Sequence, residues 1–174
     1  MIAQVSTQSL LLFAVFYPLF HLFNYRAPFV QSFYQFNLGM CGVFGGVGVF
    51  LLYWSGHPTP VKAAALGWLL LLLAITAFYW SRDSVNNWVI SIPSLAGAAV
   101  VFFLADEAHL SAGEILIQAL GALVLSAAVF ATTFGHWYLN VRALSPKFLN
   151  RAIFIFFFFL LLRLLWNLLA VALD

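Results

Sequence analysis

Long apolar runs alternate with short polar breaks along the whole chain. Six such runs can be read, at residues 8–25, 32–54, 61–80, 87–104, 113–140 and 148–172. A helix needs ~20 apolar residues to cross the hydrocarbon core of a bilayer, and each run is close to that length. The runs are continuous, without the alternation that is typical of a β-strand. The pattern therefore predicts an all-α polytopic membrane bundle of six transmembrane helices, one domain over residues 1–174, with short loops.

Composition strengthens the membrane prediction and excludes several other classes. The chain is 65% hydrophobic and 7% charged, whereas about a quarter of the residues in soluble domains are charged. A net charge of +2 without a basic cluster argues against nucleic-acid binding. The single cysteine, Cys41, excludes an intramolecular disulfide and a multi-cysteine metal site. We expect a lipid bilayer as surroundings, at the bacterial inner (plasma) membrane, with other membrane subunits or a second copy as open alternatives.

The basic residues predict how the helices are oriented. Odd-numbered loops hold five of them, which are Arg26, Arg82, Arg142, Lys147 and Arg151, while even-numbered loops hold Lys62. Short loops rich in Lys and Arg stay on the cytoplasmic side. The predicted topology therefore has both chain termini outside the cytoplasm.

Glycines recur in the second apolar run, over residues 39–48. A nucleotide-binding loop needs a strand before it and a helix after it, and this context is missing. The four-residue spacing of Gly42 and Gly46 instead predicts close approach of another helix.

Two of the runs carry polar residues on one helical face. Thr132, His136 and Asn140 follow one another at intervals of four in the fifth run, and Tyr17 and His21 do so in the first. The two histidines lie at similar distances from the predicted cytoplasmic ends of their helices. Such a pair could ligate one haem b, or the five side chains could hold the carbonyl oxygens of a quinone. Ordinary hydrogen bonds between helices are the structural alternative.

A second cluster is predicted on the outer side. His57 lies in the second loop, and Asp106, Glu107 and His109 lie in the fourth. Imidazoles and carboxylates of this kind can bind a divalent metal ion or cap a second haem. Solvated loop residues are the plainer interpretation of the same charges.

Arg163 is the most conspicuous charge because it lies deep in the sixth run. A charged side chain inside the bilayer is costly, so a partner is expected. The first interpretation is a buried ion pair with Asp106, Glu107 or Glu114. The alternative is binding of an anionic headgroup, a haem propionate or a substrate carboxylate.

The functional hypothesis that follows is a small membrane subunit that supports electron transfer, with haem b or quinone between the first and fifth helices. A carrier or channel for a small or lipid-like solute is the first alternative, with kinks at Pro18 and Pro93. A purely structural or assembly subunit that docks through the Phe-rich stretch 154–159 is the second. The chain has none of the hydrolase or phosphate-binding motifs that would indicate an enzyme class, and enzymatic activity stays open.

Overall fold

The computed structural model describes residues 2–23, 31–82, 85–140 and 145–173, and helices account for nearly all of them, with no strand in these ranges. Five helices are long and apolar enough to cross a membrane, as expected for an integral membrane protein. They are α3 (Gln31–Trp54), α4 (Thr59–Tyr79), α5 (Asn87–Glu107), α6 (Ala112–Asn140) and α7 (Pro146–Leu173). The predicted all-α membrane bundle is confirmed, and each of these helices matches its predicted run to within a few residues.

The first predicted helix is divided into three consecutive pieces. They are α1 (Ile2–Phe16), the 3-10 turn η1 (Tyr17–Leu19) and α2 (Phe20–Phe23). Pro18 has no N–H and clashes with the preceding turn, so the regular helix cannot continue through it. Two side chains of α5 lie at the carbonyl groups of the break. Asn87 Nδ2 donates to the His21 oxygen at 3.1 Å. Ser91 Oγ lies 3.4 Å from the Pro18 oxygen while it also donates to the Asn87 carbonyl of its own helix at 2.9 Å.

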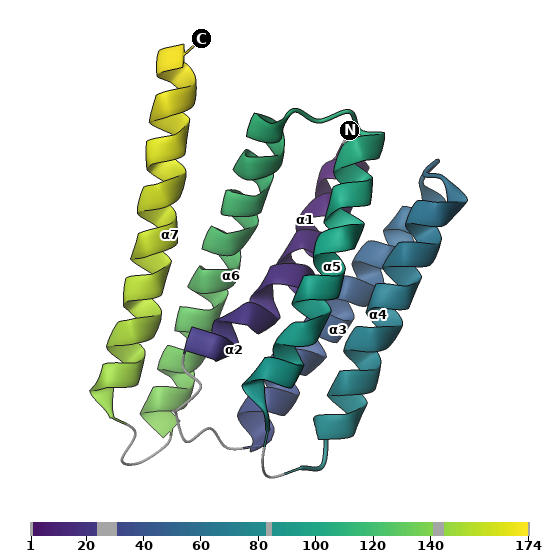
Figure 1. The fold of residues 1–174 in the computed structure, drawn as a ribbon. Helices are drawn as coiled ribbons and strands as arrows, with labels where there is room; N and C mark the ends of the chain where they lie inside the picture. Colours follow the sequence, from purple (N-terminus) through teal and green to yellow (C-terminus); the bar gives the residue numbers. More distant parts are fainter. Residues whose placement is uncertain (1, 24–30, 83–84, 141–144, 174) are drawn as a thin grey trace.

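Helix α1 lies at the centre of the bundle. It packs against α3, α5 and α6, while α4 covers α3 and α5, and α7 runs along α6 at the edge (Figure 1). The two chain ends lie at the same end of the bundle in Figure 1. We call this the terminal end; the connections α3–α4 and α5–α6 are also there. This agrees with an even number of crossings, whereas Arg26 and Arg142, used to predict the cytoplasmic side, lie outside the described residues.

A glycine of α5 sets how closely α1 can approach. A Cβ atom at Gly97 would lie 2.6 Å from one methyl of Val15 and 2.8 Å from Trp68 Nε1. Real Cβ atoms do not come this close to other heavy atoms, so only glycine fits. Trp68 itself donates from Nε1 to the Pro93 carbonyl at 2.9 Å. Helices α1, α4 and α5 therefore meet at one tightly packed point.

The predicted glycine face of α3 is only partly correct. A Cβ at Gly42 would lie 3.3 Å from Leu73 of α4, but one at Gly46 would meet nothing within 4 Å. The closest approach is instead at Gly48, where a Cβ would lie 2.9 Å from Leu11 of α1. The glycines do serve close packing, but on two faces of α3 rather than one.

Candidate functional site

His21 and His136, the predicted haem pair, lie in different surroundings. His21 is completely buried, and its ring is 5.4 Å from that of Tyr34 and 5.5 Å from that of Phe130, centroid to centroid. His136 is exposed on α6. It follows Phe130 by six residues, which at 3.6 residues per turn puts it on a different face of the helix. The structure therefore does not bring the two imidazoles together, and the tight aromatic packing around His21 leaves no site for a porphyrin there. Paired ligation of one haem stays a prediction without support from this geometry.

The polar stripe predicted on α6 does exist, but it faces away from α1. Thr132, His136 and Asn140 are all exposed. Thr132 Oγ1 donates to the carbonyl of Ala128 at 2.9 Å, and Asn140 Nδ2 donates to that of His136 at 2.8 Å. The donors of both side chains are thus paired with carbonyl groups of their own helix. The quinone site predicted from these residues has no counterpart at the α1–α6 contact.

Tyr17, in contrast, is at the centre of a buried polar contact. Its hydroxyl donates to Asn37 Oδ1 on α3, and Asn37 Nδ2 donates to the carbonyl of Phe33 at 2.7 Å. Thr133 of α6 lies beside the Tyr17 side chain, while its own hydroxyl donates to the carbonyl of Val129 at 2.7 Å. Tyr17 and Asn37 are both fully buried. These residues join three helices where η1 interrupts the first one, which is a structural role.

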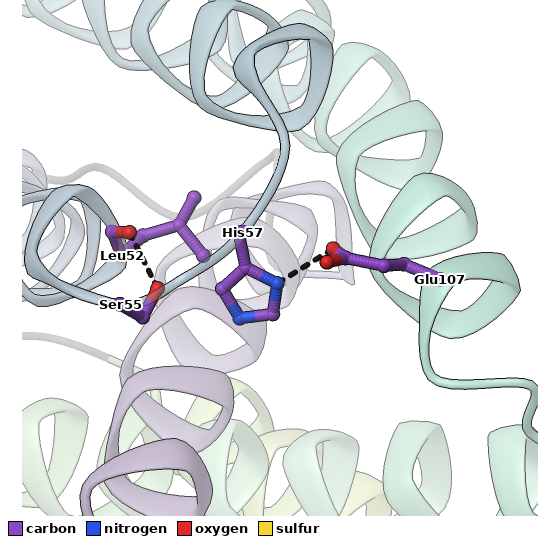
Figure 2. Close-up of polar contacts among 4 residues, drawn as sticks. All are labelled: Leu52, Ser55, His57 and Glu107. Carbon is purple, nitrogen blue, oxygen red and sulfur yellow. Dashed lines mark hydrogen bonds and ion pairs between the residues drawn. The ribbon is translucent and has the colours of Figure 1, made fainter.

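In the outer cluster, His57 pairs with Glu107. His57 Nδ1 lies 2.6 Å from Glu107 Oε2, as Figure 2 shows, and both side chains are partly buried. Asp106 and His109 are exposed. Among the residues that the structure describes, no three His, Cys, Asp or Glu side chains gather closely enough to hold a metal ion. The predicted metal site therefore has no support from this geometry and stays a prediction. The reason is geometric, because Asp106 precedes Glu107 by one helical position and is turned about 100° away from it.

The local backbone explains how His57 reaches its partner. Helix α3 ends at Trp54, and the Ser55 hydroxyl donates to the carbonyl of Leu52 at 2.5 Å, which closes the last turn (Figure 2). The chain then crosses to α4 within a few residues. His57 is thereby held across from the last turn of α5, at the terminal end of the bundle.

Arg163 does not form the expected ion pair. It makes no hydrogen bond or salt bridge with the described residues, and its Nη1 atom is buried. Of the predicted partners, Glu107 pairs with His57, and Glu114 accepts hydrogen bonds of 2.8 Å from both the backbone and the hydroxyl of Ser111.

The contact between α6 and α7 explains the absence of this pair. The Arg163 guanidinium lies over Gly121, where a Cβ atom would be 3.4 Å from Nη1. Glu114 is seven residues away from Gly121 along α6, a rise of about 10 Å. The guanidinium is therefore set too deep in the bundle to meet the acidic residues at the terminal end.

A cavity of about 290 Å³ opens at this guanidinium, between α1, α6 and α7. Its polar lining consists of Gln8, Ser9, Gln118 and Arg163, and the remaining lining residues are Gly121 and four aliphatic side chains. Gln8, Ser9 and Gln118 make no side-chain hydrogen bonds with the described residues. The cavity therefore presents two amides, a hydroxyl and a guanidinium, none of them paired with a described residue, beside aliphatic side chains, and it is partly open, since Ser9 and Leu125 are exposed.

Sequence reasoning identified Arg163 but missed the groups that accompany it. Gln118 is an isolated polar residue inside an apolar run, and this was a usable signal, since such residues seldom face lipid. Gln8, in contrast, lies in the polar stretch 6–9 at the start of the first run and did not stand out. Gly121 gave no signal of its own, because its role depends on where Arg163 of another helix passes. In comparisons with known proteins, no family model, curated sequence or solved structure matches this chain.

Proposed function

We propose that this protein binds an amphiphilic molecule from the membrane in the cavity between α1, α6 and α7, as a carrier of a lipid-like ligand. The observation that carries the proposal is the Arg163 guanidinium, whose Nη1 is buried beside the cavity without a partner among the residues that the structure describes. Leaving a buried charged donor unpaired costs more than 1–3 kcal/mol, roughly the penalty for a neutral group. A ligand with acceptor oxygens at this position removes that penalty.

The composition of the cavity lining fits a molecule with a polar head and an apolar body. Gln8 and Gln118 offer amide donors and acceptors, and Ser9 offers a hydroxyl. Leu12, Ile117 and Leu125 supply aliphatic surface beside them. A few convergent polar groups in an apolar wall are typical of small-molecule sites.

Depth favours a ligand that arrives through the bilayer. Gly121, which the guanidinium covers, follows the first residue of α6 by nine positions, a rise of about 14 Å. A water-soluble ligand would have to cross that distance of apolar surface.

We also propose the bacterial inner membrane as the location, because single-chain outer-membrane proteins are β-barrels and this chain is a helical bundle.

The earlier hypothesis of a quinone between the first and fifth predicted spans points to the same pair of helices, α1 and α6. The polar contacts differ, however, because Arg163, Gln8 and Gln118 replace the histidines. A quinone carbonyl can also accept from a guanidinium. The identity of the extracted ligand separates an electron-transfer subunit from a lipid carrier.

The test is ligand retention on purification. The protein is purified in a mild detergent, its bound amphiphiles are counted by native mass spectrometry, and organic extracts are assayed for lipids and quinones. We expect one retained amphiphile per chain in the wild type and its loss in Arg163→Gln. Lys147→Gln is the matched control, since it removes the same charge from an exposed position at the start of α7. Equal retention in Arg163→Gln and the wild type, or no retained amphiphile at all, would contradict the proposal.

A further inference from the structure

We infer that the ligand of this cavity carries one net negative charge on its headgroup, as a phosphodiester or a carboxylate; this inference rests on the proposed function. The starting point is charge balance. Among the described residues that line the cavity, Arg163 is the one with a charged side chain. A guanidinium stays protonated in proteins, so it cannot escape burial by becoming neutral.

The described protein residues do not supply the missing negative charge. Glu107 is held by His57, and Glu114 is held by Ser111 at the start of α6. Asp106 is exposed in the last turn of α5. The opposite charge must therefore come with the ligand. A single guanidinium balances a monoanion, whereas a dianionic phosphomonoester would leave one negative charge uncompensated.

The same lining disfavours zwitterionic headgroups. A choline or ethanolamine cation is recognised by carboxylates or by the faces of aromatic rings. The residues that line the cavity include neither kind of side chain. Gln8, Gln118 and Ser9 are instead suited to hydroxyl groups, which both donate and accept hydrogen bonds. We therefore expect a headgroup that is acidic and hydroxylated, or a simple carboxylate, in preference to phosphocholine.

The ligand chemistry has two possible sources, a lipid headgroup or a free anion from water. The aliphatic residues Leu12, Ile117 and Leu125 favour the lipid, since an acyl chain buries their apolar surface and an inorganic ion does not. The experiment is a titration of the full-length protein in detergent, followed by native mass spectrometry. Its probes are phosphatidylglycerol, phosphatidylcholine and diacylglycerol with identical acyl chains, a neutral ubiquinone, and inorganic phosphate.

We expect phosphatidylglycerol to bind the wild type at least about tenfold more tightly than the other probes, as a charge-assisted bidentate contact allows. Arg163→Gln should abolish this preference, Arg163→Lys should retain part of it, and Lys147→Gln should leave it unchanged. If Arg163→Gln does not fold, the preference for phosphatidylglycerol is compared between the wild type and Arg163→Lys, and a reduced preference in Arg163→Lys supports the inference.

The outcomes separate this inference from the function on which it rests. If the three lipids bind with equal affinity, saturate the protein and compete for one site, the inference about charge is wrong. The proposed amphiphile site would still be supported. If inorganic phosphate binds as tightly as phosphatidylglycerol, the ligand is a free anion and the inference of a lipid ligand is wrong. Binding of none of the lipids or the quinone would remove both the inference and the proposed function.

Discussion

The close contact between α1 and α5 gives the most direct test of the packing. Replacement of Gly97 by alanine adds one methyl group at a position where its carbon would lie 2.6 Å from Val15 and 2.8 Å from Trp68 Nε1. Two elements of the structure then have to move. These are the β-branched Val15 side chain, which is fully buried, and the indole that donates to the Pro93 carbonyl.

The magnitude follows from these two displacements. Insertion of a methylene-sized group into a packed core costs typically 1–3 kcal/mol. Weakening of the Trp68 hydrogen bond adds about 1 kcal/mol. Alanine recovers up to about 1 kcal/mol through its higher helix propensity. The expected net loss in the free energy of unfolding is therefore about 1–3 kcal/mol.

Gly46→Ala on α3 is the matched control, since a Cβ at that position meets nothing within 4 Å. The free energy of unfolding is measured for both variants in mixed micelles, by titration with a denaturing detergent and circular dichroism. We expect Gly97→Ala to be clearly less stable than the wild type and Gly46→Ala to equal it or exceed it slightly. Equal stability of the two variants would refute the close approach of α1 to α5.

Four further outcomes are expected. Tyr17→Phe leaves a buried amide oxygen of α3 without its donor and should lower the free energy of unfolding by about 1–3 kcal/mol in the same assay; no loss would contradict the buried contact. His57→Ala removes a partly exposed ion pair and should cost less than about 1 kcal/mol, so a larger loss would show that the pair contributes more than its exposure suggests. Gly121→Leu should fill the space under the guanidinium and reduce ligand retention while the helical circular dichroism signal is kept; unchanged retention would argue against this cavity. A dithionite-reduced absorption spectrum tests the haem hypothesis: the packing of His21 leads us to expect no haem b band, and a band lost in both His21→Leu and His136→Leu would show that we are wrong.

The length of the helices could be predicted from the sequence because the bilayer dictates it. Five observed helices match the predicted apolar runs closely, since hydrophobicity is lost at their ends, where polar or charged residues and, at several ends, a Gly or Pro residue follow. The break at Pro18 was also predictable as a kink, since proline lacks the donor that the helix needs. Its division into three pieces was not, because it depends on Ser91 and Asn87 of α5, which lie at the carbonyl groups of the break.

The inward face of α6 could not be predicted in the same way. Polar residues lie on both the buried and the exposed sides of this helix, so their periodicity does not mark the side that faces the bundle. The stripe through Thr132, His136 and Asn140 is real, but the side chains are exposed and two of them bond to their own backbone. Thr133, one position along, is the residue that reaches Tyr17.

Pairing between distant helices was the least predictable feature. The sequence showed that Arg163 needed a partner, and the acidic residues at the terminal end were the expected candidates. The depth of Arg163 relative to those acids depends on how α7 is positioned along α6, which the Arg163–Gly121 contact sets. No pattern within one helix contains that information. In the same way, the pairing of His57 with Glu107 required the position of a loop relative to the last turn of another helix.

The central claim is that an amphiphile occupies the cavity beside Arg163, and photo-crosslinking tests it most directly. The purified protein is irradiated with an acidic lipid that carries a photoactivatable group near its headgroup, and the modified peptides are identified by mass spectrometry. Our account predicts labelling concentrated on the cavity lining of α1 and α6, from Gln8 to Leu12 and from Ile117 to Leu125, and displaced by excess unlabelled acidic lipid. Labelling spread evenly over the lipid-facing surface of all helices, without displacement, would contradict it.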